Sequence, residues 1–189
     1  MQYKTHVTIS LAVALPIMAS TNTLSIGSVA ALSLGALFPD IDEPYSWIGC
    51  RTRGISDLLN VFFGHRGITH SLLGLLLTFL TLVLMVSIIN FNAVTAIFFV
   101  FGYALHLIQD SFSKSGIKWL SPLSDTKFQS GKGVFYYTTG SIVENFILFV
   151  TVVCLLIEIR LLDLSMFQAP NLNILQMLGN LITKFMALF

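Results

Sequence analysis

Side chains that bind transition metals recur at four separate places in this chain. They are His6, the pair Asp40 and Asp42, the pair His65 and His70, and the pair His106 and Asp110. Imidazole nitrogens combined with carboxylate oxygens suit zinc, iron or manganese, whereas calcium is held by oxygen atoms alone. Seven candidate ligands exceed what one tetrahedral ion uses, so they indicate open coordination or two neighbouring ions. We therefore predict one or two divalent transition metal ions, with zinc in first place and manganese or iron as alternatives.

The spacing within two of these pairs favours a shared site. His106 and Asp110 are four residues apart, so on a helix they lie on the same face, one turn from each other. His65 and His70 lie on either side of Gly67, which allows the segment between them to fold back.

Arg66 is the one cation inside the segment Gly64–Ser71. Its planar guanidinium pairs bidentately with oxyanions, so we assign Arg66 to binding an anionic substrate. A bound zinc ion lowers the pKa of its water to about 7, and the resulting hydroxide can attack an ester or a phosphoester. We predict that Asp42, Arg66 and His70 take part in catalysis, with one aspartate as general base.

Each of these motifs also has a purely structural interpretation. Asp40 fits a turn closed by an Asx hydrogen bond, and His106 with Asp110 fits a structural pair at a helix end. His6 alone fits an interfacial histidine, and for Glu144 helix capping is favoured over ligation. The metal interpretation therefore depends on whether the fold brings these residues together.

The composition is typical of a membrane protein. Hydrophobic residues make up 55% of the 189 and charged residues only 10%, where a soluble domain has roughly 25%. Mean hydropathy is +0.84. A net charge of +1 provides no basic field, so we exclude a nucleic-acid partner. We expect one integral-membrane domain, 1–189, in contact with membrane lipid, with the motifs in about 1–125 and a helical C-terminal part, 141–189.

Hydrophobic patterning predicts an all-α, polytopic helical membrane protein of about six helices. Two short helices, 5–19 and 24–38, form an N-terminal hairpin joined by a polar turn. Four further spans or near-spans are expected, at 71–90, 93–110, 141–162 and 172–189, the last being the weakest. The apolar spacing in 55–63 indicates a helix that lies along the membrane surface.

Alternation of these helices brings the candidate residues to one side of the membrane. The second and fourth helices return the chain to the side of its N-terminus, so 39–70 and 111–140 both lie there. All four histidines and eight of the ten Lys and Arg residues fall on that side, whereas the turns at 20–23 and 90–92 carry no charge. By the positive-inside rule this side is cytoplasmic. We predict a multi-pass protein of the cytoplasmic (inner) membrane with its site on the cytoplasmic face.

At these motifs the chain resembles the YdjM-type family of bacterial membrane-bound proteins, predicted metal-dependent hydrolases whose founding member is LexA-regulated. The resemblance covers about 1–125 and rests on Pro39–Pro44 with the following Ser46 and Gly49, Gly64–Ser71, His106 with Asp110, and the N-terminal His6. It implies a bacterial inner-membrane location, an all-helical fold and metal-dependent hydrolysis. In two places the chain departs from the pattern: Ser111–Lys114 stands where the family tends to have a Thr-Pro pair, and 141–189 carries no matching motif.

From the residues and the resemblance together we expect a membrane-bound metal-dependent hydrolase acting on a phosphoester or a lipid-linked ester. The predicted ligands are His6, Asp40, Asp42, His65, His70, His106 and Asp110. Two alternatives stay open. A metal-ion or proton transporter would distribute ionisable residues near the membrane midplane. A non-catalytic membrane adaptor with a structural metal would use a closed four-ligand site.

Overall fold

The computed structural model describes residues 1–64 and 66–162, and this part of the chain is all-helical. Its α-helices are α1 (Tyr3–Ser20), α2 (Ile26–Leu37), α3 (Arg53–Phe63), α4 (Leu72–Ile89), α5 (Ala93–Ser111) and α6 (Ile142–Leu161). Short 3-10 helices at Phe38–Asp42, Gly49–Arg51 and Ile68–His70 lie in the connections. The predicted all-α class is confirmed, and the expected helices within 1–162 are present. The expected last helix, 172–189, lies outside the described residues.

Side-chain caps explain where two of the central helices begin. The Ser25 hydroxyl accepts a hydrogen bond from the Ser28 amide at 3.0 Å, and the Ser28 hydroxyl accepts one from the Ser25 amide at 3.1 Å. This reciprocal pair satisfies two backbone N–H groups that the start of α2 would leave unpaired. The Asn92 side chain caps α5 by accepting from the Thr95 amide at 3.0 Å. Both helices therefore start at the polar turns that the sequence indicated.

Two glycines let α2 and α5 cross at close range. A Cβ at Gly35 would collide with the Phe99 carbonyl oxygen, and a Cβ at Gly102 would collide with the Leu32 carbonyl oxygen. Small residues at such crossings allow helix backbones to approach closely inside a membrane. As a result the C-terminal end of α2 is held against the C-terminal half of α5.

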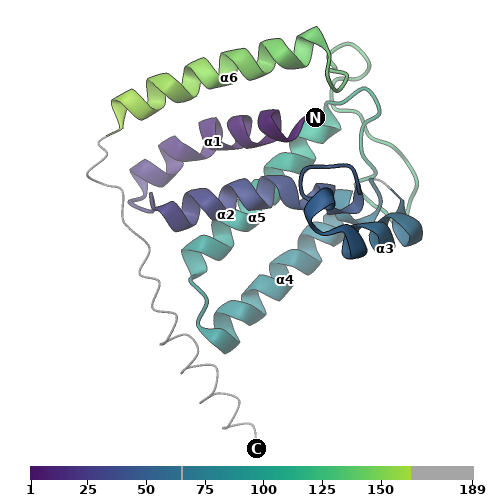
Figure 1. Ribbon diagram of the computed structural model, residues 1–189, viewed down its shortest axis with the longest axis horizontal. Coiled ribbons are helices and arrows are strands. Elements are labelled where there is room, and N and C mark those ends of the chain that lie inside the picture. Colours follow the sequence, from purple (N-terminus) through teal and green to yellow (C-terminus); the bar gives the residue numbers. More distant parts are fainter. Residues whose placement is uncertain (65, 163–189) are drawn as a thin grey trace, which may run out of the picture.

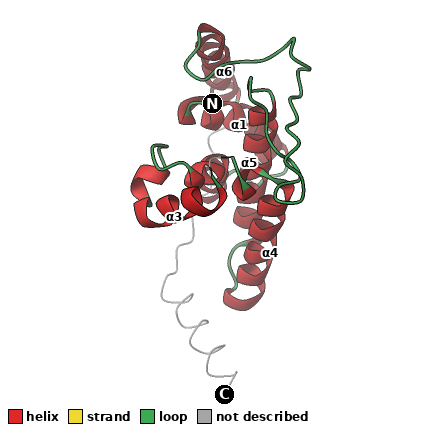
Figure 2. Cartoon of the chain, turned by 90° about the vertical axis from the view of Figure 1, so that its right-hand side faces the viewer, coloured by secondary structure: helices red, strands yellow, loops and turns green. Residues whose placement is uncertain are grey.

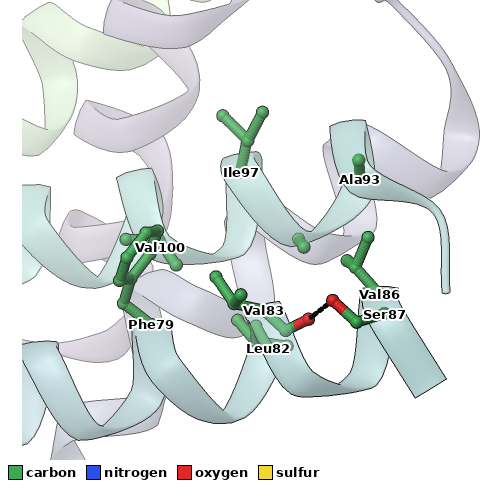
Figure 3. Close-up of a pocket in the computed structure, with 9 residues that line it drawn as sticks. Phe79, Leu82, Val83, Val86, Ser87, Ala93, Ile97 and Val100 are labelled. Atoms are coloured by element: carbon green, nitrogen blue, oxygen red, sulfur yellow. Dashed lines mark hydrogen bonds between the residues drawn. The ribbon is translucent and has the colours of Figure 1, made fainter.

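Three helices of the described chain, α4, α5 and α6, are long and apolar enough to cross a membrane. The side chains of α4 and α6 are mostly exposed, which suits helices that face lipid. An apolar cavity of about 270 Å³ lies between α4 and α5 toward the 90–92 turn (Figure 3). The Ser87 hydroxyl at its edge donates to the Val83 carbonyl at 2.9 Å, so this polar group is satisfied within its own helix.

The helices share one end, which is where the candidate residues lie. Helices α1, α4 and α6 begin there and α2 and α5 end there, on the right in Figure 1. Figure 2 looks onto this end and shows α3 on one flank and the long loop after α5 on the other. The alternation inferred from the sequence therefore corresponds to the observed arrangement.

Candidate metal centre

Three imidazole rings from distant parts of the chain lie together at this shared end. His6 is in the first turn of α1, His70 is in the 3-10 helix before α4, and His106 is near the end of α5. All three side chains are fully buried. The rings of His6 and His106 stack with centroids 3.8 Å apart, and His70 meets His106 edge-on with centroids 5.2 Å apart. Buried imidazoles in contact need polar partners, which decide their chemistry.

Each of the three rings uses its Nδ1 atom for a hydrogen bond away from the cluster. The acceptors are Gln109 Oε1 for His6 at 2.9 Å, Asp42 Oδ2 for His70 at 3.1 Å and the Ala36 carbonyl for His106 at 2.7 Å. The Gln109 amide is oriented for this by donating its own Nε2 to Ser10 at 3.1 Å. Carbonyl and carboxylate oxygens only accept, so each Nδ1 carries a proton. In the neutral ring, Nε2 is then the atom with a free lone pair.

The three Nε2 atoms point into one small region together with two carboxylates. The Nε2 atoms of His70 and His106 are 3.2 Å apart, and Asp40 Oδ1 lies 3.5 Å from the first and 3.7 Å from the second. Asp110 Oδ1 is 3.3 Å from His6 Nε2, an atom that has no hydrogen-bond partner among the described residues. Lone pairs this close repel unless a cation or proton lies between them.

Within the described residues, two groups of side chains could hold a metal ion, and they share His106. One consists of His6, His106 and Asp110, and the other of Asp40, His70 and His106, with the ligand atoms of each group within 4.8 Å of one another. Nitrogen and oxygen donors in this ratio fit zinc and related transition metals. Hydrogen bonds that fix the Nδ1–H tautomer are the usual support of histidine ligands. The arrangement fits one ion with shared ligands or two adjacent ions.

The protonation of His70 indicates that this region favours positive charge. Burial by itself lowers the pKa of His70, but hydrogen bonds to Asp40 and Asp42 outweigh burial and raise the pKa to about 9. Burial acts to raise the pKa of Asp40, yet the imidazoles around it, with His106 first, hold that pKa well below its usual range. Without a metal, a proton on His70 therefore supplies the positive charge among these carboxylates.

Asp42 lies behind His70 and braces the segment that carries it. Besides His70 Nδ1, its Oδ2 atom accepts hydrogen bonds from the Thr69 hydroxyl and from the Arg66 amide, the latter at 3.0 Å. Its backbone carbonyl accepts from Asn60 Nδ2 at 2.8 Å. Asp42 thus ties α3 and the His70 segment to the end of α2.

Arg66 connects the cluster to the loop that follows α5. Its Nη2 atom pairs with Asp110 Oδ2 at 2.6 Å, and its Nη1 atom donates to Ser113 at 2.9 Å, to Ser115 and to the Gly116 carbonyl at 3.2 Å. Its Nε atom is buried and has no hydrogen-bond partner within residues 1–64 and 66–162. The guanidinium is therefore held rigidly beside a candidate ligand.

A cavity of about 480 Å³ leads from the surface to this cluster. Asp40 and Asp110 line its inner part, and Arg66 and Lys4 add positive charge to its wall. Tyr3, Glu43, Tyr45, Ser46, Trp47 and Thr139 are among the other lining residues. The cluster is thus open to small molecules from the surface rather than enclosed by protein.

The structure brings five of the seven predicted ligands into one cluster, and these five are His6, Asp40, His70, His106 and Asp110. Asp42 accepts a hydrogen bond from His70 Nδ1, the ring nitrogen that faces away from the cluster, and does not point into the cluster. His65 lies outside the described residues. That any of them binds a metal stays a prediction. Glu144 accepts hydrogen bonds from the amides of Gln2 at 2.5 Å and Gly140 at 2.6 Å, which precede α1 and α6, so it joins the starts of these two helices, and Ser141 caps α6.

Sequence reasoning missed the groups that orient the candidate ligands. Gln109 is three residues after His106, so a search for polar side chains on that helix face could have found it. Tyr137, whose hydroxyl donates to Asp110 Oδ1 at 2.9 Å, comes from an irregular loop and gives no sequence signal. The Ala36 carbonyl is backbone, so no residue type could indicate it.

Comparisons with known proteins identify the family of the chain. The family model described as YdjM inner membrane protein matches residues 1–175. Proteins named inner membrane protein YdjM in Escherichia coli K12 and in Shigella flexneri are each 37% identical over 97 residues, which is 50% of this chain and 48% of theirs. The uncharacterized protein YvsG of Bacillus subtilis is 36% identical over 119 residues, covering 63% of this chain and 69% of that protein.

The match spans about half the length of the first two relatives. No solved structure matches the chain. The relatives named as inner membrane proteins and the apolar helices together identify a multi-pass protein of the inner membrane.

Proposed function

Because the chain belongs to the YdjM inner membrane protein family and gathers imidazoles and carboxylates at the base of an open cavity, we propose that it is a membrane-bound metal-dependent hydrolase. The proposed substrates are phosphoesters or lipid-linked esters. One observation carries the proposal: three buried Nε2 atoms with fixed tautomers face Asp40 and Asp110 where the cavity ends.

We propose that His6, Asp40, His70, His106 and Asp110 hold the metal, with zinc the first candidate. A bound divalent ion supplies an acidified water and a positive charge for the developing oxyanion. Asp42 holds His70 in the Nδ1–H tautomer, and Gln109 does the same for His6. These orienting residues keep the donor atoms in place without rearrangement.

The cavity wall supplies the contacts for an anionic substrate. Arg66 and Lys4 both line it, so the cavity supplies two cations for a bound phosphate. Asp40 belongs both to the ligand group and to the cavity, so its carboxylate lies where water and substrate reach the cluster. Hydrolysis then forms a bond from the water oxygen to phosphorus or carbonyl carbon, breaks the bond to the leaving oxygen and transfers a proton to that oxygen.

An open cavity favours catalysis over a purely structural metal, because structural sites are closed by protein ligands. The placement of the polar cluster at one end of the helices favours an enzyme over a transporter with a midplane site. The cytoplasmic side is proposed from the distribution of Lys and Arg. A topology reporter fused after Lys132 should behave as cytoplasmic, and a periplasmic signal would overturn this sidedness.

The test is metal analysis combined with a panel of phosphomonoesters, phosphodiesters and carboxylic esters, using detergent-purified protein. We expect the wild type to bind a transition metal stoichiometrically and to hydrolyse at least one ester class, and His106→Ala to lose both properties. Asp125→Asn serves as a control, because Asp125 is an exposed carboxylate that pairs with Lys118 on the loop after α5, outside the cluster. Metal retained without turnover of any ester would contradict the proposed hydrolase.

A further inference from the structure

An apolar groove of about 490 Å³ lies directly behind the candidate metal centre. It is bounded by α1, by the start of α6 and by the loop residues 134–137, with Ile9, Phe112, Phe135, Val143 and Ile147 among its lining side chains. The groove is separate from the cavity between α4 and α5, which lies toward the opposite end of those helices (Figure 3).

The inner wall of this groove is also the support of the metal cluster. Gln109 lines the groove, and its Oε1 atom accepts the hydrogen bond from His6. Tyr137 lines it too, and its hydroxyl donates to Asp110. A molecule lying in the groove is therefore separated from His6 by the Gln109 side chain and from Asp110 by the Tyr137 side chain.

The polar cavity and the apolar groove adjoin, since Met1 lines both. At the mouth of the polar cavity, the rings of Tyr3 and Trp47 stack with centroids 6.1 Å apart, and the Arg51 guanidinium lies 4.0 Å from the Trp47 ring centroid. Lys4 adds a further cation. The polar cavity thus suits an anionic head group, and the adjoining apolar groove suits an acyl chain.

The groove opens where lipid is expected. Val143 and Ile147 lie in the first two turns of α6, a candidate span. Phe135 is 76% exposed and Tyr136 45% exposed on the adjoining loop. Aromatic side chains at this level are typical of the membrane–water interface. The acyl chains of the bilayer are the apolar groups available to an apolar groove at this level.

We infer that the substrate is a phospholipid-type amphiphile, bound with its phosphate beside Lys4 and Arg66 and with one acyl chain in the groove of α1, α6 and 134–137. The inference rests on the proposed function for its chemistry and adds the substrate class. The site then takes its substrate from the membrane. By holding the acyl chain, the groove positions the phosphate of the lipid beside the cluster.

Photolabelling tests the binding mode independently of turnover. Phosphatidic acid with a diazirine in its acyl chain is added to metal-loaded protein in phosphatidylcholine vesicles, and labelled peptides are identified by mass spectrometry. We expect the wild-type protein to be labelled within 134–147. Val143→Trp should reduce this labelling about tenfold, because even small changes in an apolar pocket alter ligand binding by about that factor. The matched control is Val150→Trp on the same helix, because Val150 is similarly exposed at 41% but does not line the groove.

Metal content establishes that the variants are folded. If Val143→Trp does not fold, Ile147→Phe is a second substitution that fills the groove with a larger side chain. Equal labelling of the groove in the Val143→Trp and Val150→Trp proteins, or labelling concentrated between α4 and α5, would overturn the inference.

Turnover separates this inference from the proposed function. We expect the ratio of kcat/KM for long-chain over short-chain phosphatidic acid to fall about tenfold in Val143→Trp and to stay constant in Val150→Trp. Groove labelling without turnover of any ester would contradict the hydrolase and leave lipid binding standing. Turnover of short phosphoesters with no chain-length preference would contradict the lipid substrate and leave the hydrolase standing.

Discussion

The substitution Asp42→Asn separates an orienting carboxylate from a metal ligand. Asp42 Oδ2 accepts hydrogen bonds from His70 Nδ1 at 3.1 Å, from the Arg66 amide at 3.0 Å and from the Thr69 hydroxyl. An asparagine oxygen keeps the shape and can accept these bonds, but it lacks the charge that increases the basicity of His70 Nε2. Loss of such a partner weakens metal binding about 10- to 100-fold, which corresponds to ~1.4–2.8 kcal/mol.

The assay is competition for zinc against a chelator of known affinity, with wild type, Asp42→Asn and Asp40→Asn measured side by side. Asp40→Asn should weaken binding more than Asp42→Asn, because Asp40 contributes an oxygen to the cluster itself. Asp125→Asn should match the wild type. Equal losses in Asp42→Asn and Asp40→Asn would refute the orienting role and favour direct ligation by Asp42.

Three further predictions concern proton competition, packing and substrate charge. Zinc affinity should increase about tenfold for each pH unit up to about pH 9, because the metal must displace the proton of His70, whose pKa is raised to about 9. A chelator titration between pH 6 and 9 measures this dependence, and an affinity that does not change with pH would contradict it. Gly102→Ala should lower the free energy of unfolding by about 1–3 kcal/mol, because the new Cβ collides with the Leu32 carbonyl. Gly54→Ala should leave the stability of the protein unchanged, because the space around its Cβ is open. Thermal melts in detergent compare the two variants. Lys4→Ala should raise KM for anionic esters at unchanged metal content, with Lys132→Ala as control, and an unaltered KM would remove Lys4 from the anion site.

Helix positions were predictable from the sequence because apolar runs and polar turns alternate clearly. The uncharged run from Ser71 to Leu105 contains α4 and most of α5, and Asn90 to Asn92 marks the turn between them. Once these helices are assigned, alternation alone brings His70 and His106 to one end. Their spatial proximity therefore followed from chain direction and required no knowledge of packing.

The orientation of side chains could not be predicted in the same way. Asp40 and Asp42 are equivalent by residue type, but the 3-10 turn after α2 points Asp40 into the cluster and Asp42 toward the back of His70. The partner of His106 is a backbone carbonyl that reaches the ring only because Gly35 and Gly102 let α2 and α5 approach. Such details depend on backbone geometry that residue types do not encode individually.

X-ray absorption spectroscopy at the zinc edge measures whether His6, His70 and His106 bind a metal through their Nε2 atoms. We expect imidazole nitrogens at about 2.0–2.1 Å with carboxylate oxygen in the same shell, and one imidazole fewer in each single His→Ala variant that retains zinc. Purified wild-type protein that takes up no transition metal, or a zinc shell without imidazole, would contradict it.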